Sequence, residues 1–199
     1  MNIQRARTVC TVMLTALLLG PEAAVAGIPT DQIRATVERV LSILKDPKLK
    51  LDDATNERRA ELRAAIFPRF DFEEMAKRSL GAEWRRRTPD EQSEFVRVFT
   101  ELLKDSYITS IDSYRGERVI YNRESVDGGY AEVGTAIVTD QGEQFMIDYR
   151  LSLAGRDWKV YDVVIENISI VNNYRSQFRR ILGKSSFAEL LRLIRDKIN

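Results

Sequence analysis

The chain has 199 residues, with 31 Lys and Arg against 30 Asp and Glu, one Cys and no His. A nucleic-acid-binding domain usually carries a basic excess, and an apolar content of 44% is too high for a disordered chain. The composition also excludes a Ser-His-Asp triad, an intramolecular disulfide and a zinc site of the usual nitrogen and sulfur type.

The N-terminus has the pattern of an export signal. Two arginines precede an apolar run over residues 8–19, and a small-x-small cleavage sequence follows at 24–26. The run is shorter than the roughly 20 residues that a membrane-spanning helix needs, which disfavours the alternative of an uncleaved anchor. We therefore expect a signal peptide over residues 1–26 and an exported domain over 27–199, without the single Cys.

Helical periodicity follows in the first half of this domain. Helices are predicted at about 30–46, 53–67, 71–80 and 88–114. The clearest start signal is at Thr88, which combines an N-cap residue, Pro at the first helical position and Glu91 three residues after the cap.

From residue 118 the apolar period becomes two. Strands are predicted at 118–124, 130–139, 143–154 and 157–165, and two helices at about 172–182 and 186–197. Short turns imply an antiparallel meander. The expected fold class is α+β, with a curved antiparallel sheet of four or more strands covered on one face by helices.

Two short turns also predict the strand register. They pair Tyr149 with Asp162, Gly134 with Tyr149 and Ala136 with Ile147, so that small residues fall mid-strand on the apolar face. Such a shallow floor predicts a cleft for a long apolar ligand. The alternative is that helix side chains fill this space as ordinary core.

Several motifs resemble the MlaC family, also called the toluene-tolerance family of periplasmic phospholipid-binding proteins. The likeness covers nearly all of the exported domain in the family's order. Its most specific parts are Phe72 with Leu80-Gly81 and Trp84, Asp148-Tyr149-Arg150, Trp158-Lys159-Val160-Tyr161-Asp162, and Asn173-Tyr174-Arg175. One departure is Glu-Asn-Ile-Ser at 166–169 in place of Glu-Gly-Val-Ser, which predicts a changed bend after the last long strand.

The resemblance implies an NTF2-like or cystatin-like cone with an apolar cleft and no chemical reaction. It implies a Gram-negative periplasmic protein that carries phospholipid between an outer-membrane lipoprotein complex and an inner-membrane ABC transporter complex, maintaining outer-membrane lipid asymmetry. No cofactor, metal, nucleic acid or membrane span is expected. Two alternatives remain: a lipid hydrolase, for which Glu132 and Asp162 are the acids expected on the apolar face, and a protein-interaction module with a filled core.

The candidate lipid-binding residues come from both sides of the cleft. On the helices they are Phe72, Met75, Phe95, Phe99, Leu103 and Tyr107, and on the sheet Gly134, Ala136, Ile147, Tyr149, Leu151, Val160 and Val164. Tyr149 and Asp162 could hydrogen-bond at the rim or satisfy one another in the core. For headgroups or an acidic partner the candidates are Arg85, Arg86, Arg87, Arg175 and Arg179, with a solvated loop as the alternative for the first three.

Overall fold

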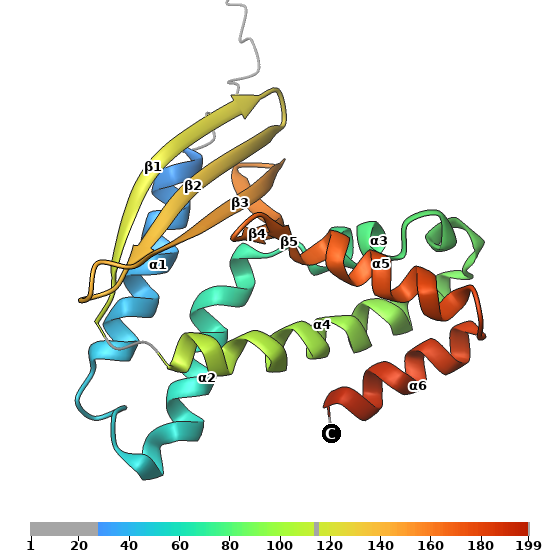
Figure 1. The fold of residues 1–199 in the computed structure, drawn as a ribbon, viewed down its shortest axis with the longest axis horizontal. Helices are drawn as coiled ribbons and strands as arrows, with labels where there is room; N and C mark the ends of the chain where they lie inside the picture. The colour runs from blue at the N-terminus through green and yellow to red at the C-terminus, as the bar shows by residue number, and fades with distance from the viewer. Residues whose placement is uncertain (1–27, 114–115, 199) are drawn as a thin grey trace, which may run out of the picture.

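The computed structural model describes residues 28–113 and 116–198. The predicted signal peptide and its cleavage site lie outside the described residues. In the described part the protein has helices on one face of an antiparallel sheet, as the sequence predicts (Figure 1). No helix in these two ranges is both long and apolar enough to cross a membrane.

The helices begin and end close to the predicted positions. They are α1 (Pro29–Lys45), α2 (Thr55–Ile66), α3 (Phe72–Leu80), α4 (Pro89–Asp112), α5 (Ile170–Leu182) and α6 (Phe187–Ile198), with short 3-10 turns η1 (Asp52–Ala54), η2 (Phe67–Arg69) and η3 (Gly81–Arg86).

Local hydrogen bonds explain this agreement. At α4 the Thr88 hydroxyl accepts from the Glu91 N–H while the Glu91 carboxylate accepts from the Thr88 N–H. At α3 the Asp71 carboxylate caps the N–H of Glu74. Both caps satisfy backbone donors that the first turn of a helix leaves without partners.

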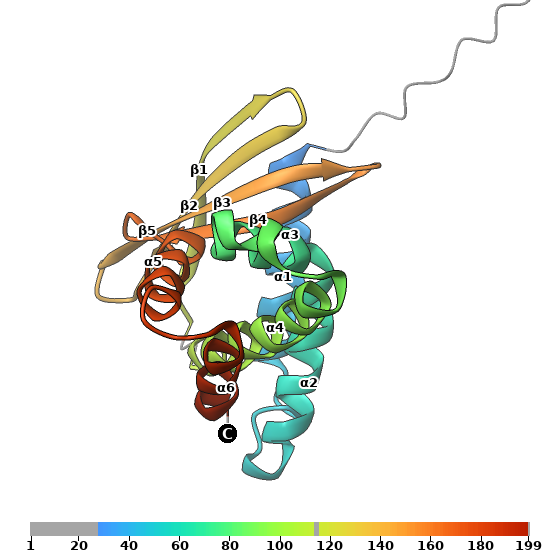
Figure 2. The same cartoon turned by 90° about the vertical axis from the view of Figure 1, so that its right-hand side faces the viewer.

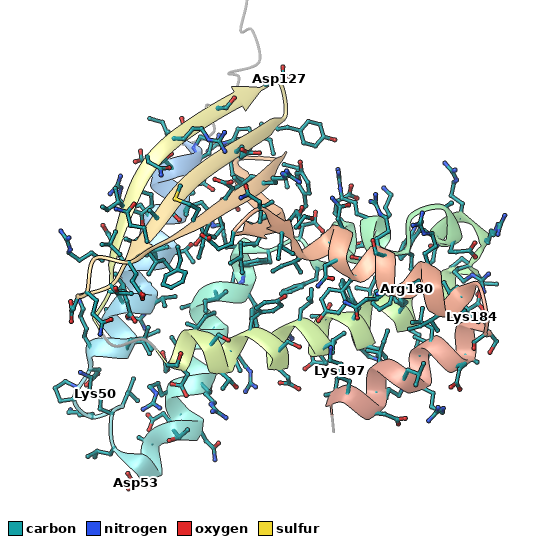
Figure 3. The ribbon with its side chains drawn as sticks, viewed as in Figure 1. Lys50, Asp53, Asp127, Arg180, Lys184 and Lys197 are labelled. Atoms are coloured by element: carbon teal, nitrogen blue, oxygen red, sulfur yellow. The ribbon has the colours of Figure 1, made fainter. Side chains whose placement is uncertain are left out.

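The sheet is a meander of five strands in chain order. They are β1 (Arg118–Asp127), β2 (Tyr130–Val138), β3 (Gln144–Ala154), β4 (Asp157–Ile165) and β5 (Ile168–Ser169). Figure 3 places Asp127, at the tip of the first hairpin, and Asp53, in η1, at opposite ends of the molecule.

The predicted pairing of β2 with β3 is wrong by one residue. Gly134 pairs with Asp148, not Tyr149, and Ala136 pairs with Met146, not Ile147. The N–H of Thr139 donates to the carbonyl of Glu143, so the hairpin loop has an odd number of residues instead of two. Because side chains alternate between faces, this one-residue change turns Gly134 and Ala136 away from the helices.

The pairing of β3 with β4 follows the prediction only near the turn. Leu151 pairs with Val160 as expected, but a bulge follows, and Tyr149 then pairs with Val163 instead of Asp162. The extra residue reverses the alternation of faces along β4. Asp162 and Val164 therefore face away from the helices.

The turn between β4 and β5 contains the departure from the family pattern. Glu166 and Asn167 have φ angles of 49° and 66°, both in the left-handed region. Ile165 and Ile168 pair across them. Asn tolerates the left-handed conformation better than most residues, so Asn167 can occupy this position in place of a glycine.

Two hydrophobic clusters form the interior. The larger one joins α3, the first part of α4, α5, α6 and the sheet. A smaller one joins the end of α1, α2 and the later part of α4, and consists of Ile43, Leu44, Leu62, Ile66 and Ile108. Figure 2 shows the helices gathered below the sheet, with α4 running between the others. An apolar cavity borders both clusters.

Candidate functional site

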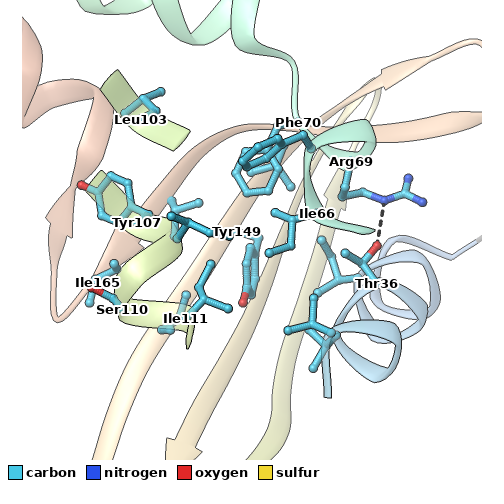
Figure 4. Close-up of a pocket in the computed structure, with 18 of the residues that line it drawn as sticks. Thr36, Ile66, Arg69, Phe70, Leu103, Tyr107, Ser110, Ile111, Tyr149 and Ile165 are labelled. Atoms are coloured by element: carbon cyan, nitrogen blue, oxygen red, sulfur yellow. Dashed lines mark hydrogen bonds between the residues drawn. The ribbon is translucent and has the colours of Figure 1, made fainter. Parts of the chain in front are cut away.

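An apolar cavity of about 390 Å³ lies between the inner face of the sheet, α1, the segment from Ile66 to Phe70 and the C-terminal half of α4 (Figure 4). The helices contribute mainly Ile33, Val37, Val40, Leu41, Leu44, Leu103, Ile108 and Ile111, and the strands Val119, Ile137, Ile147, Val160, Val163 and Ile165. The volume falls within the range of about 300–1,000 Å³ that is usual for ligand sites.

The lining of the cavity extends along most of α1. On that helix it runs from Ile33 to Leu44, which corresponds to about 16 Å at the rise of an α-helix. Half of the roughly 30 Å hydrocarbon core of a bilayer is about 15 Å. The part of α1 that lines the cavity is therefore about as long as one extended hydrocarbon chain as it lies in a membrane leaflet.

Two tyrosines bring hydroxyl groups to this lining. Burial is the main cause that raises the pKa of Tyr107 to about 12, and the negative charge of Asp162 adds to it. Burial likewise raises the pKa of Tyr149 to about 12, against a hydrogen bond with Thr135 that lowers it. Both hydroxyls are therefore neutral at physiological pH and add polarity without charge.

Arg69 is the basic residue of the lining, and its guanidinium is held by α1 and β4. Nη1 donates to Oε1 of Gln32 at 2.6 Å and to the carbonyl of Trp158 at 2.9 Å, and Nε donates to Oγ1 of Thr36 at 3.3 Å (Figure 4). Oε1 of Gln32 also accepts from the backbone N–H of Trp158 at 2.9 Å. Arg69 thus fastens one end of α1 to the sheet.

An ionic cluster holds α2 against the end of α4. The carboxylate of Asp112, which is only 8% exposed, accepts from Nε of Arg58 and, at 3.2 Å, from Nε of Arg59. These hydrogen bonds, that of Arg58 first, hold the pKa of Asp112 below its usual value. Nη1 of Arg58 also donates to the carbonyl of Leu49 at 2.6 Å. The cluster fixes the α4 turn that carries Ser110 and Ile111 into the cavity wall.

Seven predicted residues border the cavity. They are Phe72, Met75, Leu103, Tyr107, Ile147, Tyr149 and Val160.

Three other predicted residues lie in filled core beyond the cavity. The rings of Phe95 and Phe99 stack 5.6 Å apart and are fully buried, and Leu151 is fully buried below the sheet. Further rings from α5 and α6 close this cluster: Tyr174, Phe178 and Phe187. The apolar face in the N-terminal half of α4 therefore packs against α5 and α6 and does not line the cavity.

The prediction that Gly134, Ala136 and Val164 face the cleft is wrong, because the register places them on the outer face of the sheet. A Cβ atom at Gly134 would lie 2.8 Å from Oδ1 of Asn122 and 3.0 Å from Oδ1 of Asp148. Close approach does explain this glycine, but the approaching groups are polar side chains of neighbouring strands.

The acids predicted on the apolar face also lie on the outer face. Glu132 pairs with Arg123 and with Arg150, the latter at 3.4 Å, and Asp162 pairs with Arg150 at 3.2 Å. Oδ2 of Asp162 accepts from the Ser169 hydroxyl at 2.7 Å. Asp162 therefore neither meets Tyr149 nor forms a dyad in the cavity, and instead ties the sheet to the start of α5.

The sequence prediction missed α1, the segment before α3 and the end of α4 as cavity walls. The periodic face of α1, with Ile33, Val37 and Val40, was visible in the sequence. Periodicity shows that this face is covered but not which element covers it. Only the fold shows that α1 crosses the inner face of the strands.

The predicted arginines are not among the residues of the cavity wall. Arg85, Arg86 and Arg87 belong to or follow η3, before the start of α4, whereas the cavity borders α4 from Leu103 onward. The Arg87 guanidinium lies 4.9 Å from the centre of the Phe187 ring. Arg175 and Arg179 lie on α5, and Nε of Arg175 donates to the carbonyl of Arg78 at 2.7 Å.

Comparison of the sequence with known protein families identifies the family of this chain. The sequence model of the MlaC protein family matches residues 34–196. The chain belongs to the MlaC family. This confirms the resemblance carried by the motifs around Trp84, Tyr149 and Trp158.

Two curated relatives of this MlaC-family chain span most of its length. The Haemophilus influenzae intermembrane phospholipid transport system binding protein MlaC is 21% identical over 92% of this chain and 88% of its own. The Pseudomonas putida toluene tolerance protein ttg2D is 25% identical over 83% of this chain and 79% of its own.

A solved structure confirms the fold of this family member. It is that of a phospholipid-binding protein from Ralstonia solanacearum in complex with a phospholipid. The TM-score is 0.76 at 24% identity, over 86% of this chain and 97% of the other. Among the described residues of the present chain, no group of three or more acidic or Cys side chains could hold a metal ion.

Proposed function

We propose that this protein is a periplasmic carrier of phospholipid, acting as a single domain over residues 27–199, and that an acyl chain occupies the cavity below the sheet. The observation that carries the proposal is the apolar character of this cavity, and the extent of its lining along α1, in a chain of the MlaC family. The Haemophilus and Ralstonia proteins, which are named for phospholipid transport and phospholipid binding, support the same ligand class.

The energetics favour such a carrier. Exposing a methylene group to water costs about 0.8 kcal/mol, so one acyl chain of about 15 methylenes costs on the order of 12 kcal/mol. A cavity that buries most of one chain removes most of this cost. The lining also includes the polar residues Ser110, Ser113 and Glu117, at the end of α4 and just before β1, and we propose that the headgroup lies beside them.

The carrier would receive phospholipid from one membrane complex and deliver it to another. We propose the outer-membrane lipoprotein complex and the inner-membrane ABC transporter complex of the family as these partners. Release would require a partner to compete for the chain or to open the cavity, because spontaneous exit carries the cost of exposing the methylenes.

The proposal includes no chemical change of the lipid and no cofactor. A hydrolase of the kind considered above needs a polar dyad beside the bound lipid. The two acids that were candidates for it, Glu132 and Asp162, are held in ion pairs on the other face of the sheet. The hydroxyls of Tyr107 and Tyr149, with pKa values raised to about 12, are poor bases at neutral pH.

The test is native mass spectrometry of the protein purified from the periplasm, followed by extraction and identification of the released lipid. We expect intact phospholipid in defined stoichiometry. Lysophospholipid that accumulates during incubation would indicate hydrolysis. Protein that releases no lipid would refute the carrier function and favour the interaction module with a filled core.

A further inference from the structure

The charges of this chain are divided between two parts of the molecule. Residues 170–199 contain seven Arg and Lys but only two Asp and Glu, a net charge of +5. Residues 119–169 contain four basic and nine acidic residues, a net charge of −5, whereas residues 28–118 have 18 of each sign. The sheet is therefore acidic, and the pair of C-terminal helices is basic.

Part of this basic charge is exposed and unpaired. Both arginines of α6 form ion pairs. Arg179, Arg180 and Lys184 form none with any residue that the structure describes, and all three are exposed. Figure 3 shows Arg180 on α5, Lys184 in the turn that follows and Lys197 on α6, all away from the sheet tip at Asp127. A surface that keeps like charges together without partners attracts anionic groups.

A shallow groove of about 360 Å³ runs between α5 and α6 at the same place. It is lined by Gln177, Arg180, Ile181, Lys184, Ser185 and Leu193. Leu193 is 38% exposed and is the only exposed large apolar side chain on the described residues of these two helices. The α5–α6 groove thus combines a small apolar floor with cations beside it.

We propose that the α5–α6 groove docks an acidic segment of another protein. An apolar side chain of that segment would cover Ile181 and Leu193, and its carboxylates would pair with Arg180 and Lys184. Complementary charge of this kind speeds association and selects the partner.

The shape of the groove favours a protein over an anionic membrane surface. Helices that lie in a membrane interface present a row of large apolar side chains to the lipid. Here the apolar faces of α5 and α6 point into the core through Phe178, Leu190 and Ile194, which leaves Leu193 alone outside. The docking proposal rests on the lining and the charges of the groove and does not depend on the proposed function.

The experiment uses a fluorescein-labelled peptide of twelve residues in which Glu and Leu alternate, titrated with the full exported protein while anisotropy is measured. We expect binding that weakens as salt is raised, and a loss of at least tenfold in affinity in R180E/K184E. Leu193→Ser should also weaken binding. The control K48E/K50E makes the same change in net charge at two exposed lysines after α1 and should keep wild-type affinity.

Several results would overturn the proposal. These are no binding to wild type, an equal loss in R180E/K184E and K48E/K50E, or binding of vesicles containing phosphatidylglycerol without binding of the peptide. Concentration-dependent self-association abolished by R180E/K184E would overturn it too, because the occupant would then be the acidic sheet of a second copy. Phospholipid content is measured on the same samples and should be unchanged in R180E/K184E, so a failed docking surface and a failed carrier function give different results.

Discussion

Val37→Phe tests whether the space beside α1 is the site of the acyl chain. Val37 lines the cavity and is half-buried against the main core. The substitution adds four carbon atoms to the side chain. If they displace four methylenes of a bound chain, the loss is about 3 kcal/mol, or roughly a 200-fold weaker affinity.

The control is Val98→Phe, the same change at a valine that is 2% exposed in the filled part of the core. Overpacking there should lower the free energy of unfolding by about 1–3 kcal/mol and leave the lipid content of the folded fraction unchanged. Val37→Phe should instead leave the unfolding of delipidated protein unchanged or stabilise it, because the new ring fills empty space.

Two measurements separate the sites. Extracted phospholipid per protein chain is determined by mass spectrometry, and denaturant unfolding is followed on delipidated samples, because bound lipid would itself add stability. Suppose that Val37→Phe retained wild-type lipid and lost as much stability as Val98→Phe. The assignment of the cavity to the acyl chain would then be refuted.

Three further predictions concern the sheet, the Asp112 cluster and the two tyrosines that line the cavity. Gly134→Ala should lower the free energy of unfolding by about 1–3 kcal/mol without changing lipid content, because the alanine Cβ would meet polar atoms of neighbouring strands on the outer face. Reduced lipid occupancy in a stable variant would contradict the observed register. Asp112→Asn should lower the free energy of unfolding by about 1–3 kcal/mol at neutral pH. Because the folded pKa of Asp112 is lowered, the stabilisation by its carboxylate is complete above about pH 3.8 and is lost as the pH falls through the folded pKa. Unchanged acid unfolding in the variant would argue against the ionic cluster. The pKa values of Tyr107 and Tyr149 are raised from 10.0 to about 12. Stability should therefore decline as the pH rises from about 10 to about 12, and phenolate absorbance should show that these two tyrosines ionise late. Complete ionisation of both near pH 10 in folded protein would contradict their burial.

Element positions could be predicted from the sequence because the signals for them are local. The capping box at Thr88 and the cap at Asp71 each involve atoms within four residues of one another. Alternation of apolar residues likewise marked four of the strands. The fold class followed from the order of these elements, and the comparison structure confirms it.

The cavity wall could not be predicted because it depends on register. A single extra residue in the loop after β2 moved Gly134 to the outer face, and the bulge in β4 did the same to Asp162. A bulge has no reliable local sequence signal, and every residue beyond it changes sides. The placement of α1 is a long-range property that no pattern within the helix contains.

The separation of the hydrophobic interior into two clusters beside one cavity has a consequence for an unloaded molecule. The small cluster around Leu62 and Ile108 continues into the rest of the interior along α4, and Arg69 joins the segment after α2 to β4. A bound acyl chain would act as the missing piece of core between them. We therefore expect empty protein to exchange amide hydrogens and to be cleaved by proteases faster around α1 and α2 than loaded protein. Under the proposed function, the lifetime of the protein would then depend on whether lipid is bound.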